Sequence, residues 1–198
     1  DPLWINREAY HGERDGIRTG VGFAAGMKGY SVGINGAPDY SFAQGVVTRD
    51  GRICLSVACI EMGQGCFTAM AEMFAQTMKI PLESVNMTDL CNSDRNEETG
   101  ATASSRVTHA VGLAVTAAAQ ELVEALREAA AKQAGVAPET LEHVDGGFLL
   151  GGKRMSFAQI AAACPADIVR RTRVRTKYSD QPSEGGLGHP HVLYSSNA

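Results

Sequence analysis

One long periodic segment constrains the fold of this chain more than any other feature. Apolar residues recur at steps of three and four from Val107 to Ala129, which is the spacing of a helix face. Such a helix spans about 40 Å, and Gly135 follows it in the position of a C-cap. Its first half, "HAVGLAVTAAA", is small and apolar nearly all round, whereas charged residues enter the second half. We therefore predict a long helix whose first half is buried.

A hairpin and a shorter helix are predicted ahead of the long helix. The segments "DYSFAQGVVT" and "RICLSVAC" flank residues 49–52, where Asp-Gly suits a tight turn. From Cys66 to Met78, phenylalanines and methionines recur at helical steps and Pro81 follows, so we interpret them as core residues of a helix. The segment "ESVNMTDL" predicts a short strand. Seven glycines in residues 16–36 predict loop and irregular strand there.

The remainder of the chain, from Val136, reads as a smaller layer. It contains "LEHVDGGFLL", a turn at residues 151–152, a short helix from Ser156, and a strand from about residue 168 to residue 178. The final "HVLYSSNA" predicts one more strand. Together these elements predict an α+β fold with mixed sheets, a hairpin and one long buried helix.

We interpret the chain as a single domain fragment with two layers. Residues 1–198 form the fragment, residues 37–135 its main layer, and residues 136–198 a smaller, truncated layer. At 198 residues and 44% hydrophobic content, the chain is long enough for a substantial core. The first residue is Asp1, which indicates a processed or excised piece.

Charge and cysteine content narrow the classes of function. The formal net charge of −4 argues against nucleic acids and membrane surfaces as partners, because both are bound through clustered cations. No apolar run reaches the roughly 18 residues of a membrane span. The five cysteines show no CxxC pair and no zinc-like spacing, so a reducing cytoplasm is the expected location.

Two polar, small-residue loops share one construction. Residues 61–66 and residues 99–106 each lead into a predicted buried helix, whose first backbone N–H groups are open to a ligand. The side-chain amide of Gln64 can both donate and accept hydrogen bonds. The second loop contributes hydroxyl groups from Thr102, Ser104 and Ser105. Both loops are therefore candidate cradles for an anion or a polar ring. The alternative is that they are ordinary helix caps and turns.

The motifs in these loops resemble a known family. "EMGQG" between a strand and a helix, followed by "TGATASSRVTHAVGLAV", resembles the large, molybdenum-bearing chain of the xanthine dehydrogenase and aldehyde oxidase family, the molybdenum hydroxylases. The likeness covers most of residues 16–135, including "GIRTGVGFA" and "TRDGRICLSV", and extends faintly to "HVLYSSNA". The sequence departs from the family pattern at Cys59-Ile60 and at Cys66.

The resemblance implies that the chain has the fold of that family's molybdopterin-binding domain and binds molybdopterin with its molybdenum. Three residues would contact the pterin: Met62, Gly63 and Gln64. Others would line its phosphate side: Thr102, Ser105, Arg106 and Val107, with Ser104 beside them. Because the pterin ligates the metal, no protein metal ligand is implied. If the dinucleotide form of the cofactor is used, Arg106 is a partner for a phosphate.

The resemblance also implies a reaction and partners. The reaction is hydroxylation of a purine, another N-heterocycle or an aldehyde, with electrons leaving through iron–sulfur clusters and FAD in other domains or subunits. The partners are these and the rest of the large subunit. The general-base glutamate is expected outside this chain, and Glu184 in "SEGGLG" is interpreted as a loop residue. The fragment is therefore expected to be inactive alone.

Two alternatives come from other classes of protein. In the first, Cys66 in the first turn of a helix has a lowered pKa and acts as a nucleophile or redox sensor, with His109 or His143 as its base. In the second, the chain is a non-catalytic interaction module. Its only indication is a basic strand face: Arg171, Arg173, Arg175 and Lys177. We interpret the histidines of residues 189–191 as exposed rather than metal-binding.

Overall fold

The chain divides into two compact units in the computed structural model. Residues 1–29 and 194–198 form one unit, and residues 30–193 form the other. The structure describes residues 5–20, 22, 24, 26–30, 39–90, 92–97, 99–176 and 193–197. Each unit is described by itself below.

The smaller unit is built from short strands. It contains the 3-10 turn η1 (Arg7–Tyr10), the hairpin of β1 (Gly12–Arg14) and β2 (Ile17–Thr19), and β3 (Gly26–Tyr30), which pairs with β11 (Leu193–Asn197). The strand β11 confirms the one predicted from "HVLYSSNA". Every residue of β1 and β2 is exposed, so this hairpin has no core of its own.

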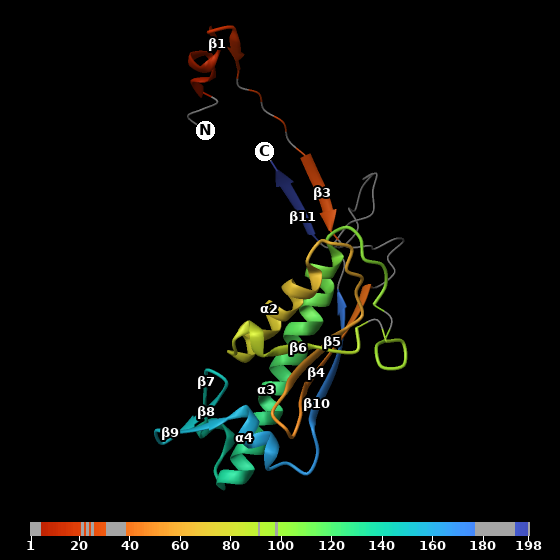
Figure 1. The fold of residues 1–198 in the computed structure, drawn as a ribbon, viewed down its shortest axis with the longest axis vertical. Helices are drawn as coiled ribbons and strands as arrows, with labels where there is room; N and C mark the ends of the chain where they lie inside the picture. Colours follow the sequence, from red (N-terminus) through yellow and green to blue (C-terminus); the bar gives the residue numbers. More distant parts are fainter. Residues whose placement is uncertain are drawn as a thin grey trace, which may run out of the picture. The chain divides into compact units, whose positions relative to one another are not determined.

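A four-stranded mixed sheet organises the larger unit. Its strand order is β10 (Ile168–Thr176), β4 (Asp39–Val47), β5 (Ile53–Val57) and β6 (Val85–Met87) (Figure 1). The β10–β4 and β4–β5 pairs are antiparallel, and β5–β6 is parallel. β10 therefore joins the main sheet, whereas the sequence analysis assigned it to the smaller layer. Its pairing partner lies more than a hundred residues away along the chain, which no local pattern reveals.

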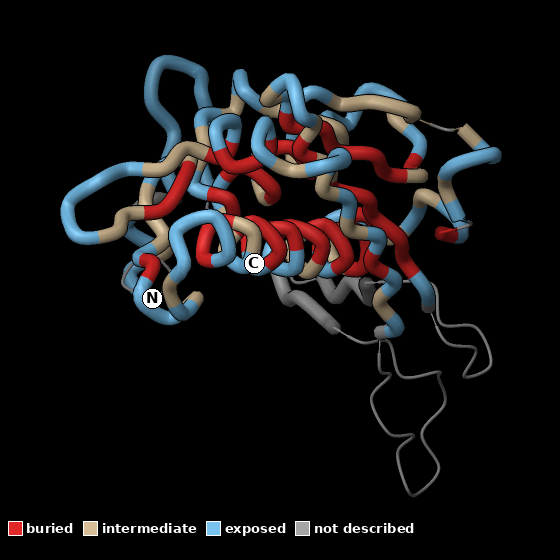
Figure 2. Tube along the Cα trace, turned by 90° about the horizontal axis from the view of Figure 1, so that it is seen from below, coloured by how far each residue is buried: buried red, intermediate tan, exposed pale blue. Residues whose placement is uncertain are grey.

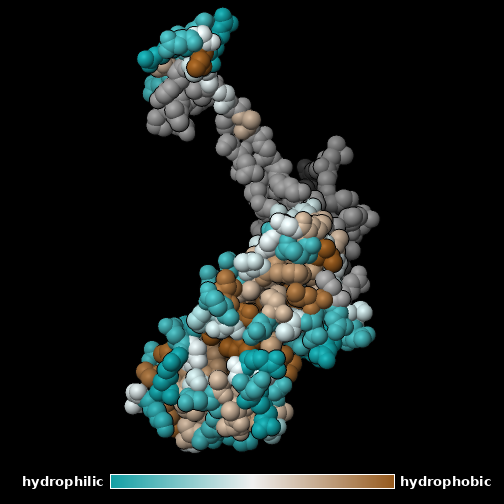
Figure 3. All heavy atoms as spheres, in the orientation of Figure 1, coloured by the Kyte–Doolittle hydropathy of each residue, from teal (hydrophilic) through white to brown (hydrophobic). Residues whose placement is uncertain are grey.

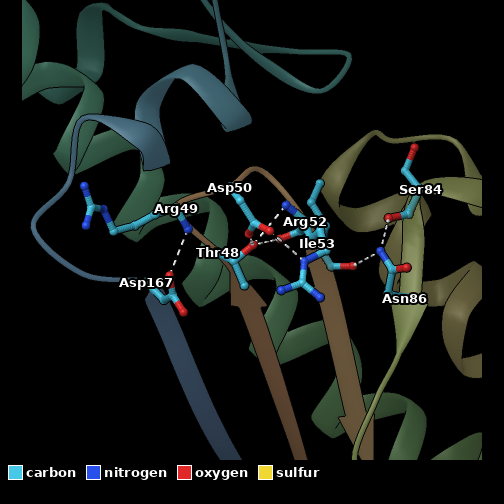
Figure 4. Close-up of polar contacts among 8 residues, drawn as sticks. All are labelled: Thr48, Arg49, Asp50, Arg52, Ile53, Ser84, Asn86 and Asp167. Atoms are coloured by element: carbon cyan, nitrogen blue, oxygen red, sulfur yellow. Dashed lines mark hydrogen bonds and ion pairs between the residues drawn. The ribbon is translucent and has the colours of Figure 1, made fainter.

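The turn between β4 and β5 has the predicted Asp-Gly construction, and its polar contacts are drawn in Figure 4. The Thr48 hydroxyl donates to Asp50 and accepts from the Arg52 backbone N–H at 3.0 Å. The hydrogen bond from Thr48, together with the nearby Arg52 guanidinium, lowers the pKa of Asp50. Arg49 N–H donates to Asp167 Oδ1 at 2.8 Å, which ties the turn to the segment ahead of β10. The predicted hairpin is confirmed.

Two helices pack on the main sheet and complete the core. They are α2 (Cys66–Met78) and α3 (Gly112–Ala134), and Figure 2 shows buried residues along most of the long helix. A Cβ at Gly45 would lie 3.0 Å from Phe74 and 3.1 Å from Leu122. Glycine at this position therefore lets both helices approach the sheet closely. Both helix predictions are confirmed, including the burial of the first half of the long one.

The long helix differs from the prediction at its start. Residues Val107–Val111 form a π-helical turn, η3, and regular α-helix begins at Gly112. A Cβ at Gly112 would lie 2.8 Å from the Met73 sulfur, so the glycine allows α2 and α3 to cross closely. At the other end, Gly135 is left-handed and its N–H donates to the Ala131 carbonyl, as predicted for a C-cap.

A three-stranded sheet and a short helix cover the C-terminal part of α3. The strands are β7 (Glu142–Val144), β8 (Gly147–Leu150) and β9 (Lys153–Ser156), and the helix is α4 (Phe157–Ala162). Ser156 and Gln159 form a capping box at the start of α4. Single 3-10 turns, η2 (Leu82–Ser84) and η4 (Pro138–Thr140), complete the described elements. Of the helices in the described part of the chain, none has the length and apolar character needed to cross a membrane.

Candidate functional site

The two loops singled out from the sequence lie side by side in the larger unit. The Thr99 hydroxyl donates to the carbonyl of Ala58, and the backbone N–H of Ile60 donates to Thr102 Oγ1 at 3.0 Å. These two hydrogen bonds connect segments about forty residues apart in the chain. These bonds hold the segment that follows β5 against the segment that precedes η3, so the two loops form one continuous structure.

A cavity of about 390 Å³ lies between these loops. Most of the residues predicted from the sequence line it: Met62, Gln64, Thr102, Ser104, Ser105, Arg106 and Val107. Three other lining residues lie within the two predicted loops without having been named as contacts: Gly65, Cys66 and Ala103. Ala69 and Thr108 also line the cavity, and the sequence analysis did not indicate them. Gly63 does not line the cavity. Helical spacing from Gly65 would have indicated Ala69, which lies one turn further along α2.

The first loop is folded around the carboxylate of Glu61. Its two oxygens accept backbone N–H groups from Gly63 at 2.8 Å, Gly65 at 2.9 Å and Phe67 at 3.3 Å. The hydrogen bond from Gly65 makes the largest contribution in lowering the pKa of Glu61 to about 2. The sequence pattern predicts that these N–H groups are open to a ligand anion. That expectation is wrong for the start of α2, because Glu61 already serves as the anion.

The amide of Gln64 also stabilises the first loop. Its Oε1 accepts from the Met62 backbone N–H at 2.5 Å, and its Nε2 donates to the Ile60 carbonyl at 2.8 Å. Gly63 and Gly65 have φ angles of +95° and +75°, which L side chains rarely adopt. The glycines therefore allow the tight path, and Glu61 and Gln64 hold it.

Two serines of the second loop have an uncommon backbone. Ser104 and Ser105 have φ angles of 49° and 52°, in the left-handed region that few non-glycine residues adopt. The Arg106 N–H closes the turn by donating to the Ala103 carbonyl at 2.9 Å. Such strain persists only where surrounding contacts hold it and is concentrated at binding sites. The strained pair lies directly on the cavity wall.

Arg106 is buried beneath the second loop, with 2% of its surface exposed. Its guanidinium donates to the carbonyls of Tyr40 and, at 3.4 Å, of Ala101. A Cβ at Gly100 would lie 3.3 Å from this guanidinium, so the glycine leaves room for it. Arg106 thus anchors the loop to β4, and its pairing with a phosphate stays a prediction.

Apolar side chains surround part of the cavity. Figure 3 shows them gathered over the ends of α2 and α3 that lie near the two loops. Met62 lines the cavity and is 68% exposed, which is high for a side chain of this kind. The first loop therefore offers an apolar contact beside the hydroxyls of the second.

The structure contradicts a reactive, low-pKa Cys66. The side chain is buried, and burial raises the pKa of its thiol, an effect to which the nearby Glu61 carboxylate adds. His143 lies near the far end of α2, where its ring nitrogen contacts the Met78 carbonyl. Cys66 and Met78 are about 18 Å apart along the helix, so His143 is no base for this thiol. His109 lies in η3 with its Nε2 buried and without a hydrogen-bond partner.

The basic face of β10 makes contacts within the chain. Arg171 donates to Gln44 Oε1 at 2.5 Å, and Arg173 pairs with Glu97 at 3.4 Å. The guanidinium of Arg173 also lies 4.6 Å from the centre of the Tyr40 ring. These partners favour a solvated strand face. Residues 177, 184 and 189–191 of the sequence analysis lie outside the described residues.

Other hollows in the described part of the chain include the following two. The larger, about 730 Å³, lies at the C-terminal end of α2 and is lined by residues such as Glu72, Gln76 and Asp145. The other, about 490 Å³, lies behind the two loops and includes Asn92 and Asn96. We favour the 390 Å³ cavity despite its smaller volume, because strained backbone and two sequence motifs meet there. No cluster of three or more potential metal ligands occurs among the described residues.

The mixed sheet, the two helices and the loop-bounded cavity define an α+β domain with a candidate ligand site beside a helix start. The chain belongs to the molybdopterin cofactor-binding domain family, which matches residues 3–198. The family assigned by resemblance in the sequence analysis is therefore confirmed.

The curated proteins that are similar in sequence include the following two. The gamma subunit of the 6-hydroxypseudooxynicotine dehydrogenase complex from Paenarthrobacter nicotinovorans is 29% identical over 153 residues, 75% of this chain and 18% of that protein. The probable aldehyde oxidase gad-3 from Caenorhabditis elegans is 25% identical over 114 residues, 58% of this chain and 9% of that protein. The chain thus spans less than a fifth of either relative.

Solved structures show the same fold at low sequence identity. The aldehyde oxidoreductase from Desulfovibrio desulfuricans has a TM-score of 0.62 and 20% identity, covering 86% of this chain and 16% of that one. Quinoline 2-oxidoreductase from Pseudomonas putida 86 has a TM-score of 0.58 and 21% identity, covering 72% of this chain and 19% of that one. The predicted α+β class with mixed sheets is confirmed.

Proposed function

We propose that this chain is part of a molybdenum-dependent oxidoreductase and that the 390 Å³ cavity binds its molybdopterin. The observation that carries the proposal is the meeting of the two loops around one cavity in a member of this cofactor-binding family. The reaction we propose is hydroxylation of an aldehyde or of an N-heterocycle such as a purine. The names of the similar proteins, an aldehyde oxidase and a dehydrogenase complex subunit, support this class.

The cavity offers groups that fit a pterin. Hydroxyls from the second loop and from η3 can each donate and accept: Thr102, Ser104, Ser105 and Thr108. Met62 adds apolar surface on the opposite wall. In our proposal Met62 and Gln64 border the ring system, and the hydroxyls bind its polar edge. Gly63 acts indirectly, because its positive φ allows the tight turn that places Met62 and Gln64 at the cavity. When bound, the cofactor supplies the metal centre at which the substrate is oxidised.

The chain's own residues position and enclose the cofactor rather than transform the substrate. Glu61 and Gln64 hold one wall, and Arg106 anchors the other. Residues 1–198 are, in this proposal, one fragment of the cofactor-binding domain, with residues 37–135 providing the cavity. The general base is assigned to no residue of this chain.

The partners follow from the proposed reaction. Electrons from the substrate must leave the cofactor, and we propose iron–sulfur clusters and FAD in other domains or subunits for that role. The rest of the large subunit completes the site, and a cytoplasmic location suits the reduced thiols. The relative named as one subunit of a complex supports an assembly of this kind.

A cavity-filling variant tests the binding site. Ala69→Phe places a ring into the cavity without changing a residue of either loop, whereas Thr68→Phe changes the neighbouring exposed residue of α2, which does not line the cavity. We expect Ala69→Phe in the complete protein to lose most of its molybdenum and pterin, because the ring occupies the ligand's volume. Thr68→Phe should keep both.

The measurement is molybdenum by inductively coupled plasma mass spectrometry, with fluorescence of the released, oxidised pterin. The melting temperature of each variant checks that it is folded. Equal molybdenum in a folded Ala69→Phe protein and in Thr68→Phe would exclude this cavity as the binding site. Absence of molybdenum from the unmodified protein, made in a host that builds the cofactor, would exclude the enzyme class itself.

A further inference from the structure

The two positions where the sequence departs from the family pattern meet in space. Cys59 follows β5 and Cys66 begins α2, and their Sγ atoms lie 3.7 Å apart. The two side chains are 2% and 6% exposed. We propose that Cys59 and Cys66 form a reversible disulfide that joins the two ends of the loop formed by residues 60–65.

The position of each cysteine allows the bond to form. A disulfide needs a sulfur separation of about 2 Å, so the two atoms must approach by less than 2 Å. The loop between them contains Gly63 and Gly65, both with positive φ, and such residues accommodate small backbone shifts at little cost. The ends of the loop are held by β5 and α2, which keep the two sulfur atoms together before any bond is made.

The chemistry needs an oxidant, and a small-molecule disulfide suffices. The thiolate of one cysteine attacks a sulfur of the small disulfide and releases one small thiol, which leaves a mixed disulfide on the protein. The second cysteine then attacks that mixed disulfide and releases the second small thiol. Two protein S–H bonds are lost, one S–S bond forms, and the oxidant takes up two electrons and two protons.

Burial makes this reaction slow rather than impossible. Burial raises the pKa of the Cys66 thiol, so little thiolate is present near neutral pH. Entry of the oxidant requires opening of the loop. The bond therefore forms slowly but between one defined pair, because local geometry supplies the second thiol immediately.

The cross-link restrains the wall of the cavity. Gln64 and Met62 lie between the two cysteines and line the cavity. Joining the loop ends reduces the conformations open to this segment, so it opens less often. A consequence for release of the cofactor rests on the proposed function. The cross-link itself does not, because it involves residues of this chain alone.

The test uses the complete protein, first reduced and then treated with a limiting amount of 2,2′-dithiodipyridine near pH 8. Remaining thiols are alkylated, and the protein is cut with trypsin and with a protease that cleaves after glutamate. Cleavage after Glu61 separates Cys59 from Cys66, so only a disulfide keeps the two peptides joined. We expect one joined product, about 2 Da lighter than the sum of its reduced peptides.

Control variants remove the other described cysteines. Cys54 lies in the same peptide as Cys59, so Cys54→Ser removes an ambiguity of assignment, and Cys164→Ser serves as a distant control. Both variants should still yield the joined product. Cys66→Ser should not. Alkylation of Cys59 and Cys66 in the folded, oxidant-treated protein, or a mixture of pairings with Cys54, would overturn the proposal.

Hydrogen exchange tests the effect on the loop. We expect the amides of Gly63, Gly65 and Phe67 to exchange about tenfold more slowly in the oxidised protein than in the reduced one. Equal exchange in both forms would show that the bond does not fix the loop. Neither measurement requires bound molybdopterin, so failure of the proposed function and failure of this inference are distinguishable.

Discussion

At the scale of single residues, one carboxylate determines the shape of the first loop. Glu61 accepts three backbone N–H groups at the start of α2, where helices otherwise leave donors without partners. A carboxylate in this position also interacts favourably with the helix dipole. Its neighbour Gln64 uses both ends of its amide within the same loop. Both residues therefore act on the cavity by holding the backbone that borders it.

The pH dependence of stability should reveal this carboxylate. The folded-state pKa of Glu61 is lowered from 4.5 to about 2, so its contribution is fully present above about pH 4.5 and disappears as the pH falls toward 2. We expect Glu61→Gln to melt at a lower temperature than the unmodified protein near pH 7, and the difference to shrink toward about pH 3.

Thermal unfolding followed by circular dichroism across this pH range measures the difference. Glu72→Gln is the matched control. Glu72 is an exposed carboxylate within α2, the helix whose start Glu61 caps, and Glu72 itself caps no helix end. A difference between Glu61→Gln and the unmodified protein that stays constant from pH 7 to about pH 3 would contradict the assigned role.

At the scale of elements, close packing of α3 on the sheet holds the site in place. The N-terminal end of α3 continues from η3, which carries the second loop, and the helix packs on β4 and β10. Gly45 in β4 and Gly112 in α3 each remove a side chain where two elements approach. The position of the second loop therefore depends on contacts spread along a whole helix.

A core variant of α3 tests the energy of this packing. Leu122 is fully buried against the sheet, so Leu122→Ala should lower the free energy of unfolding by about 2 to 5 kcal/mol through lost burial and a cavity. Leu113→Ala removes the same atoms from a side chain that is 45% exposed and should cost less than about 1 kcal/mol. Urea denaturation gives both values. Similar losses for the two variants would contradict the packing described.

At the scale of the whole molecule, the two units differ in the contacts that stabilise each of them internally. The larger unit has a continuous apolar core that runs from β4 and β5 through α2 and α3 to Phe148 and Phe157. In the smaller unit, the β1–β2 hairpin has only exposed residues. A two-stranded hairpin without an apolar face is marginally stable in water.

Hydrogen exchange measured by mass spectrometry should separate these units. We expect amides of β4 to exchange about 10³-fold more slowly than those of β1 and β2, since core strands open only by extensive unfolding. Peptides covering residues 12–19 and 39–47 report the two rates. Comparable protection of both peptides would show that the hairpin is stabilised by contacts other than its own.

Local patterns in the sequence determined most elements of this protein. The hairpin at Asp50-Gly51, the helix Cys66–Met78 and the C-cap at Gly135 follow from turn chemistry and periodicity, which act over a few residues. Paired motifs also determined the family, and with it most of the residues that line the cavity. Such features need no knowledge of distant contacts.

Only the tertiary structure decided what depends on distant parts of the chain. It paired β10 with β4, directed the Arg106 guanidinium to the Tyr40 carbonyl, and brought the sulfur atoms of Cys59 and Cys66 together. It also gave the N–H groups at the start of α2 to Glu61, which reversed the expectation of an open anion site. The physical reason is the same in each case: pairing, burial and hydrogen-bond partners are set by which surfaces meet in the folded chain, and a sequence pattern records only one side of each contact.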